Sequence, residues 1–379
     1  MMAMTTIFIN GKFTAQRMTG VQRLAAGLIQ ALDQLLLASG TTARWVLLCP
    51  PGAKPPPLRA MEVRTVGPRR GGLHAWEQVF LPMYTAGRPL LNLAGPAPLL
   101  KLRQVCMIPD AAIFDFPDAY TRTYGAWYRL LFRTVARTAS SLLTISQFSR
   151  NRLIDAIGPA AERLRIVHCA ATHMTAVAPD DTVLDRLGLR NVPFLLAVGS
   201  ANPTKNLPAL VSGFAGVPDP EVRLMLVGGS NSAVFAGQAA QVPSDPRVIH
   251  TGAINDNELA SLYRHALAFA FPSLYEGFGI PPLEAMSLGC PVVAARAASI
   301  PEICADAALY FDPASTPDIT RALIEIIDDP ALRERLQGQG AIRARHFTWE
   351  RAARQLLDYL AQDGVIRRDT IEASSAASQ

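Results

Sequence analysis

Two acidic side chains, Glu276 and Glu284, are separated by seven residues in a segment that also contains two glycines and two prolines. Carboxylates accept hydrogen bonds from hydroxyl groups, so a spaced pair is suited to a neutral, hydroxyl-rich molecule such as a sugar or a ribose. An ordinary strand-turn-helix connection with two solvated carboxylates has the same pattern. The acids alone leave both interpretations open.

The residues around this pair predict a strand, a glycine loop and a helix. The apolar run 266–271 is typical of a buried strand, and Gly277 and Gly279 allow another molecule to approach the main chain closely. Pro281 and Pro282 suit the first turn of a helix, where a missing N–H costs little. The N-terminus of that helix carries unpaired N–H groups and partial positive charge, which predicts a phosphate-binding site.

A lysine follows an earlier strand in a similar setting. The strand 194–198 is expected to end at Gly199-Ser200, and the chain then turns through Asn-Pro and presents Lys205 before a helix over 206–216. A lysine at the C-terminal end of a strand can neutralise a diphosphate. Taken alone, the segment is explained equally well by a surface lysine beside a turn.

Predicted strands and helices alternate along the chain in two series. This alternation predicts an α/β protein in which parallel sheets are covered by helices. The first series has strands at 6–10, 45–49, 104–108, 142–146 and 164–168, and helices at 21–37, 74–81, 122–139 and 147–158. The second has strands at 194–198, 223–227, 248–250, 266–271 and 290–295, and helices at 206–216, 255–265 and 283–288.

A stretch containing prolines and acids, 178–192, interrupts the alternation, and the length of 379 residues suits two domains. We expect a first domain over 1–178 and a second over 179–362. The segment 363–379 is small and polar at its end and is expected to be disordered. Ligands of open parallel sheets bind at the C-terminal ends of the strands, so the expected ligand site lies in a cleft between the domains.

Charge is divided unequally between the two halves. Residues 1–178 contain 20 Lys and Arg and 8 Asp and Glu, a net charge of +12, whereas residues 179–379 contain 16 and 23, a net charge of −7. A basic half suits an anionic partner, which is a membrane surface, a lipid pyrophosphate or nucleic acid. We favour membrane or phosphate and expect no nucleic acid, because no nucleic-acid motif or aromatic stacking platform is visible. An incidental basic surface is the alternative.

The remaining composition narrows the class of protein. The five cysteines are scattered and the six histidines form no His-x-x-x-His pair, which predicts reduced, mostly buried thiols and no metal site. No apolar run reaches the roughly 20 residues of a membrane span. The first residues lack the pattern of a signal peptide. We therefore expect a cytoplasmic protein, placed at the inner face of the cell membrane if the basic half contacts lipid.

In this order, the segments resemble the retaining nucleotide-sugar glycosyltransferases of family four along residues 5–362. The motifs that carry the resemblance, besides the two glutamates and the lysine loop, are 19–23, 145–150, 227–229, 250–254, 258–259 and 347–353. The resemblance implies the GT-B fold, in which two Rossmann-like β/α/β domains face each other across a cleft. It also implies that a helix over 349–362 crosses back to the first domain.

The resemblance implies roles for individual residues. Lys205 would bind the donor diphosphate, Glu276 the sugar hydroxyls and Glu284 the ribose hydroxyls. Gly20 would let the first domain close on the phosphates, and the N–H groups at the helix start would hold the distal phosphate or the sugar. The implied catalytic residues are Glu276, Lys205 and Asp110. The implied donor-binding residues are Gly20, Gly199, Ser200, Lys205, Asn206, Gly228, Ala253, Ile254, Glu276, Gly277, Phe278, Gly279, Ile280 and Glu284.

The reaction implied by the resemblance moves a hexose from a nucleoside-diphosphate sugar to a saccharide acceptor without metal or cofactor and with retained configuration. The first guess for the donor is GDP-mannose. Two positions depart from the family pattern: Thr204 stands where an Arg is usual, and Pro109 stands where a His usually precedes the Asp. These departures permit a non-catalytic nucleotide-sugar-binding protein as an alternative. A nucleotide-sugar epimerase on the same fold is another.

The acceptor is expected to be lipid-linked, in bacterial exopolysaccharide or O-antigen synthesis, because relatives commonly extend such lipids. Arg129, Arg133 and Arg137 recur every four residues on the helix 122–139 and predict a basic stripe. The stripe is either the solvated side of a core-facing helix or a peripheral contact with an anionic membrane. His173 is expected in the outgoing loop of the first domain.

Overall fold

The computed structural model describes residues 5–39, 41–69, 72–199, 202–228, 244–252 and 254–367. The chain divides into two compact units. The first unit comprises Met1–Phe114, Ala126–Cys169 and Trp349–Gln379, and the second comprises Asp115–Gly125 and Ala170–Thr348. The domain boundary at 178/179 stays a prediction, and the units themselves change at Cys169.

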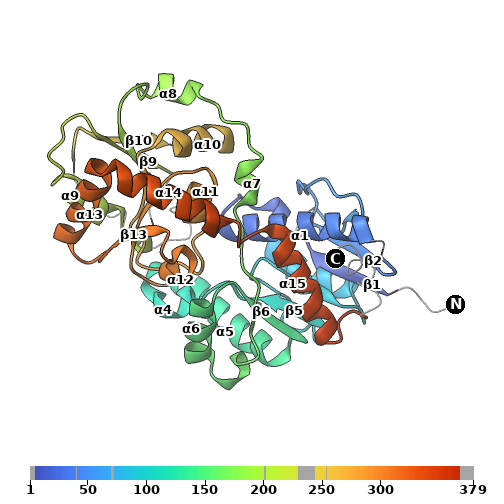
Figure 1. Ribbon diagram of the computed structural model, residues 1–379. Coiled ribbons are helices and arrows are strands. Elements are labelled where there is room, and N and C mark those ends of the chain that lie inside the picture. The colour runs from blue at the N-terminus through green and yellow to red at the C-terminus, as the bar shows by residue number, and fades with distance from the viewer. Residues whose placement is uncertain are drawn as a thin grey trace. The chain divides into compact units, whose positions relative to one another are not determined.

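The described residues of the first unit form a seven-stranded sheet in the order β3-β2-β1-β4-β5-β6-β7, in which every neighbouring pair is parallel (Figure 1). Its strands are β1 (Thr6–Asn10), β2 (Arg44–Cys49), β3 (Glu62–Thr65), β4 (Leu90–Asn92), β5 (Gln104–Met107), β6 (Ser141–Thr144) and β7 (Arg165–Ile166). The prediction omitted β3 and β4. The first is a largely exposed edge strand and the second has three residues, so neither shows a clear pattern of apolar residues.

Helices follow most of these strands. They are η1 (Lys12–Ala15), α1 (Gly20–Ser39), α2 (Gly72–Ala75), the π-helix η2 (Trp76–Phe80), α3 (Leu81–Tyr84), α4 (Ala112–Asp115), α5 (Arg122–Thr138), α6 (Gln147–Ile157), η4 (Pro159–Ala161) and α15 (Trp349–Gln362). The short helix η3 (Pro117–Ala119) and the first residues of α5 fall within Asp115–Gly125, which belongs to the second unit. Helix α15 belongs to the first unit, where it packs against α1 (Figure 1). The two helices meet at Gly27, where a Cβ atom would lie 2.4 Å from the Trp349 ring.

The described residues of the second unit form a six-stranded parallel sheet in the order β10-β9-β8-β11-β12-β13. Its strands are β8 (Phe194–Val198), β9 (Arg223–Val227), β10 (Val248–Gly252), β11 (Ala268–Phe271), β12 (Val292–Ala295) and β13 (Ala308–Phe311). Its helices are α7 (Thr172–Thr175), α8 (Thr182–Arg186), η5 (Pro203–Lys205), α9 (Leu207–Phe214), α10 (Asp256–His265), α11 (Ile280–Ser287), α12 (Ile300–Cys304), α13 (Thr316–Asp328) and α14 (Pro330–Ala344).

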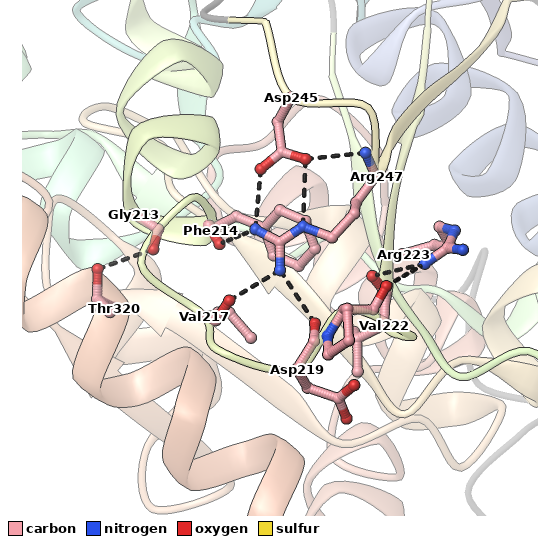
Figure 2. A network of polar contacts seen from close by, with 10 residues as sticks. Gly213, Phe214, Val217, Asp219, Val222, Arg223, Asp245, Arg247 and Thr320 are labelled. Carbon is pink, nitrogen blue, oxygen red and sulfur yellow. Dashed lines mark hydrogen bonds and ion pairs between the residues drawn. The ribbon is translucent and has the colours of Figure 1, made fainter.

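An arginine network fixes the loops that enter β9 and β10 (Figure 2). The Arg247 guanidinium is paired with Asp245, donates to the carbonyls of Phe214, Val217 and Asp219, and stacks on the Phe214 ring at 4.6 Å. Phe214 is the last residue of α9, and its carbonyl also accepts from the Val217 N–H at 2.9 Å, so Arg247 ties the turn after this helix to the start of β10. The network lies at the N-terminal ends of the strands and leaves their C-terminal ends free for the site.

The segment that was expected to be disordered, 363–379, is ordered where it is described. The N–H groups of Val365 and Ile366 both donate to the carbonyl of Leu360, and Arg165 is paired with Asp363 at 2.6 Å. Val365 and Ile366 are buried. These contacts extend the first unit beyond α15, and residues 368–379 lie outside the described part of the chain.

Candidate functional site

Lys205 and Glu276 form an ion pair at the C-terminal edge of the second sheet. Lys205 ends η5, which is capped by the Asn202 side chain accepting from the Thr204 N–H at 3.1 Å. The Lys205 ammonium donates to Glu276 at 2.5 Å, and both side chains remain partly exposed. The loops that carry them follow β8 and β11, which are neighbours where the strand order reverses. Ligands of open α/β sheets bind at such a reversal.

The loop after β11 is held by hydrogen bonds on two sides. The Leu274 N–H donates to the Thr204 carbonyl at 2.8 Å, which joins this loop to the lysine loop. The fully buried Ser299 hydroxyl lies 2.8 Å from the carbonyls of both Glu276 and Phe278. A hydroxyl has one proton, so it donates to one carbonyl at a time. These contacts fix the backbone on both sides of Gly277.

Helix α11 begins at Ile280, three residues before the predicted range 283–288, and has both prolines in its first turn as the sequence predicts. Gly279 has φ +111° and precedes the helix, and Pro281 and Pro282 lie in its first turn. The side chain of Phe278 is buried edge-on against Phe347 at 5.6 Å. Its aromatic ring is therefore part of the core, and a ligand at the helix start would meet backbone N–H groups rather than this ring.

Glu284 is buried on α11, and both of its carboxylate oxygens have partners. One oxygen lies 3.0 Å from His173 Nε2, and the Tyr263 hydroxyl donates to the other at 3.3 Å. His173 lies on α7 of the second unit, whereas the sequence reasoning expected it in the outgoing loop of the first domain. The pairing could not be found from the sequence, because His173 and Glu284 are 111 positions apart.

Glycines bring the ends of β8, β9 and β10 together. Gly228 has φ +142°, and a Cβ atom there would lie 1.9 Å from the Gly199 carbonyl oxygen. The Gly228 N–H in turn points to the carbonyl of Gly252 at 3.4 Å. Only a glycine fits such a close backbone approach. Two predicted donor residues beside these glycines, Ser200 and Ala253, lie outside the described residues.

The other two predicted residues of the second unit lie next to these loops. Asn206 has a left-handed backbone, φ 53°, and its amide donates to the Pro313 carbonyl at 3.0 Å. Ile254 is partly buried and precedes the Asn255–Glu258 capping box that starts α10. Their roles toward a donor stay predictions.

The remaining predicted residues belong to the first unit. Gly20 is the exposed first residue of α1, and a Cβ atom there would meet nothing within 4 Å. Space alone therefore does not require a glycine at this position. The Asp110 carboxylate accepts from the Ala112 N–H at 2.8 Å, at the start of α4. The structure thus brings Lys205 and Glu276 into contact in the second unit, while Gly20 and Asp110 form part of the first.

A buried polar network, which the sequence reasoning did not find, lies where the strand order of the first sheet reverses. Lys12 is paired with Glu77 at 2.8 Å, and the two side chains are 5% and 1% exposed. The Asn10 amide donates to Glu77 at 3.2 Å and to Asn92 at 3.0 Å. Asn10 and Asn92 end β1 and β4, and Glu77 lies on the π-helix, a form that is frequent at functional sites.

The described residues give no support for a reactive thiolate, a metal site or a membrane-spanning helix. The five cysteines are all buried, and burial raises the pKa of the Cys106 and Cys304 thiols to about 12, so neither is a thiolate at neutral pH. Within the described ranges, no group of three or more His, Cys, Asp or Glu is placed to hold a metal ion. No described helix is long and apolar enough to cross a membrane.

Comparison with curated proteins finds glycosyltransferases. The chain is 29% identical to O-antigen chain mannosyltransferase B of Escherichia coli over 264 residues, which is 68% of this chain and 69% of that protein. It is 27% identical to the serotype-specific mannosyltransferase WbdA of Escherichia coli over 67% of this chain, but this match spans only 31% of the length of WbdA.

Comparison with solved structures finds the same fold. Sucrose-phosphate synthase from Thermosynechococcus elongatus matches with a TM-score of 0.73 at 19% identity, over 94% of this chain and 98% of that one. HepE from Anabaena, solved in complex with UDP and glucose, matches with a TM-score of 0.68 at 18% identity, over 95% and 100%. Residues 185–343 match the family model of the glycosyl transferases group 1. The chain is therefore a glycosyltransferase of the GT-B fold, and its residues 185–343 are similar to the glycosyl transferases group 1.

Proposed function

We propose that this protein transfers mannose, with retention of configuration, from GDP-mannose to a lipid-linked saccharide in bacterial O-antigen or exopolysaccharide synthesis. The observation that carries the donor side is the Lys205–Glu276 pair beside the start of α11, where the strand order of the second sheet reverses. The names of the relatives, which are O-antigen and serotype-specific mannosyltransferases, support mannose and this class of acceptor.

The ion pair supplies a physical account of donor binding. A diphosphate at the start of α11 competes with Glu276 for the Lys205 ammonium, because it carries more charge and lies at the positive end of the helix. Glu276, once displaced, is available to accept hydrogen bonds from sugar hydroxyls a few ångströms away. Donor binding and sugar recognition are then coupled through one salt bridge.

The same groups stabilise the leaving diphosphate. The bond between the anomeric carbon and the diphosphate oxygen breaks while a bond to the acceptor oxygen forms, and the acceptor proton passes to the leaving phosphate. Lys205 and the N–H groups of α11 offset the charge that develops on that phosphate. We propose that this chemistry needs no metal ion. It takes place at the inner face of the cell membrane, where the lipid-linked acceptor would be presented.

A thermal-shift screen tests the donor site first. Wild type is measured without metal against GDP, UDP, dTDP and ADP, beside Lys205→Ala and Glu284→Ala. We expect stabilisation by GDP above the other nucleotides and a loss of most of that shift in both variants. The exposed residues Lys54 and Glu334 supply the controls Lys54→Ala and Glu334→Ala, which should bind like wild type. No shift with any nucleotide would contradict a working donor site.

A transfer assay then tests the reaction. Labelled GDP-mannose and a lipid-linked saccharide are incubated with enzyme in the presence of a chelator, and the new anomeric linkage is assigned by NMR. We expect an α-linked product, and a rate about 10²-fold to 10³-fold lower for Lys205→Ala. Epimerised nucleotide sugar without acceptor would favour an isomerase. Nucleotide binding without any product would favour a non-catalytic protein.

A further inference from the structure

Exposed apolar side chains gather in one part of the first unit. Val79, Met83, Tyr84, Leu100 and Leu102 are each more than half exposed, and Leu100 reaches 89%. We call these five side chains the apolar face. They lie within two short segments, 79–84 and 100–102, whereas the other large exposed apolar residues of the described chain are spread between Met18 and Ile342. Exposed apolar side chains lack the stabilisation that burial would give them, so their clustering calls for a partner.

Hydrogen bonds join the two segments of the apolar face into one surface. The Gln78 amide donates to the Ala97 carbonyl at 3.0 Å and accepts from the Leu99 N–H at 3.0 Å. Lys101 lies between Leu100 and Leu102, and its buried ammonium donates to the Thr85 carbonyl at 2.6 Å. The lysine therefore anchors the loop to the end of α3 and leaves its two leucine neighbours pointing outward.

The charges that accompany this surface are positive. Glu77 is the single acidic residue between Glu62 and Asp110 in the sequence, and it is buried against Lys12. Arg88 and Arg103 are exposed in the same two connections, and Arg103 donates to the Gly87 carbonyl at 3.2 Å. The apolar face is thus bordered by cationic groups with no exposed carboxylate among residues 78–109.

We propose that the apolar face docks the first unit on an anionic lipid bilayer, with its side chains in the interfacial region and Arg88 and Arg103 at the lipid phosphates. An apolar surface bordered by arginine is the pattern of interfacial membrane binding. A second copy of the chain is a poorer occupant. In a symmetric dimer the same surface would meet itself, and the arginines of both copies would repel each other.

This surface differs from the basic stripe that the sequence predicts on α5. Arg129 donates to the Ile113 carbonyl at 3.2 Å, and the Arg133 guanidinium lies over the Phe114 ring at 5.4 Å. Arg137 donates to the Arg133 carbonyl at 3.4 Å, so all three stripe arginines contact the chain itself. The α5 stripe has one exposed large apolar residue, Leu130, so it lacks the apolar content of the surface around Leu100.

Vesicle cosedimentation of the full chain tests the proposal. The vesicles contain phosphatidylcholine alone or with phosphatidylglycerol. We expect binding to the anionic vesicles, a loss of about tenfold or more in Leu100→Gln/Leu102→Gln, and a smaller, salt-dependent loss in Arg88→Gln/Arg103→Gln. The matched control is Leu37→Gln/Ile342→Gln, at exposed apolar positions outside the apolar face, and it should bind like wild type.

Thermal unfolding of each variant shows that it is folded, and light scattering gives its oligomeric state. The proposal is overturned if the wild-type protein does not bind anionic vesicles, or if Leu100→Gln/Leu102→Gln binds them as well as wild type. It is also overturned if those substitutions abolish a dimer and leave vesicle binding unchanged. The assay contains no sugar nucleotide, so its result is independent of the proposed mannosyl transfer.

Discussion

His173, on the short helix α7, contacts Glu284 and so affects how this carboxylate is oriented in the candidate donor site. A buried carboxylate is costly unless its oxygens are hydrogen bonded, and here His173 and Tyr263 satisfy one oxygen each. If Glu284 takes the ribose hydroxyls, its orientation depends on these two partners. His173 is then a positioning residue that acts through Glu284.

Replacing His173 tests this role. In His173→Ala the KM for the donor should rise about tenfold, because a hydrogen bond to a charged group is lost, while kcat should change less. In His173→Gln an amide N–H is available to the carboxylate, so much of the affinity should return. Steady-state kinetics at varied donor concentration make the measurement. An unchanged KM with a lowered melting temperature would assign His173 a purely structural role.

The sequence predicted which residues are chemically important better than it predicted their neighbours. Lys205 and Glu276 were recognised because each lies in a loop of glycine and proline after an apolar strand. That the two side chains pair in the free protein depends on contacts 71 positions apart and has no local signal. Ser299 and Tyr263 were missed for the same reason, since a buried hydroxyl has no periodic pattern around it.

At the scale of elements, the loops after β8 and β9 are locked by the approach of Gly228 to Gly199. Gly228→Ala should lower the free energy of unfolding by roughly 2 kcal/mol or more, because the methyl group collides with backbone and the conformation is strained. Gly188→Ala is the control, since Gly188 also has a positive φ but has open space around it. Urea denaturation measures the free energy of unfolding of both variants. An equal decrease in both would show that the backbone around Gly228 relaxes at little cost.

The arginine network at the opposite ends of these strands predicts a pH dependence. Hydrogen bonds from Arg247 lower the pKa of Asp245 below its ordinary value of 3.8. The carboxylate therefore contributes stability above that value and loses the contribution as the pH falls through the lower, folded pKa. Asp245→Asn should reduce stability at neutral pH, and its difference from wild type should shrink well below pH 3.8. Denaturation of both proteins at neutral pH and well below pH 3.8 measures the difference in their free energy of unfolding. A difference that does not change with pH would contradict the linkage.

The two parallel sheets followed from the sequence because alternating strands and helices are a local pattern. Strands β8 and β9 begin and end where they were predicted, since each is a short apolar run between polar residues. Strand β13 was omitted from the prediction, because two of its four residues are only partly buried and its pattern is weak. The order of strands within each sheet was not accessible, since it depends on which connections cross over.

For the whole molecule, the docking of α15 on α1 should control the stability of the first unit. Gly27→Leu places a side chain where the Trp349 ring lies, so the helix has to move away. We expect a lower melting temperature and faster proteolysis near residue 349. The control Gln30→Leu adds the same side chain at an exposed position of α1 and should do neither. An unaltered digestion pattern in Gly27→Leu would show that the two helices do not depend on this contact.

The return of the chain at Trp349 also bears on the order of events during synthesis. The first unit needs α15 and the residues up to Ile366 to cover α1, yet these are translated after the second unit, which ends at Thr348. A nascent chain therefore holds the N-terminal sheet with one side of α1 uncovered while nearly all of the second unit leaves the ribosome. The second unit has its own core, which does not include α15, so it can fold before α15 is translated. We expect it to be the first part of the protein to reach its native packing, although its sequence is translated second.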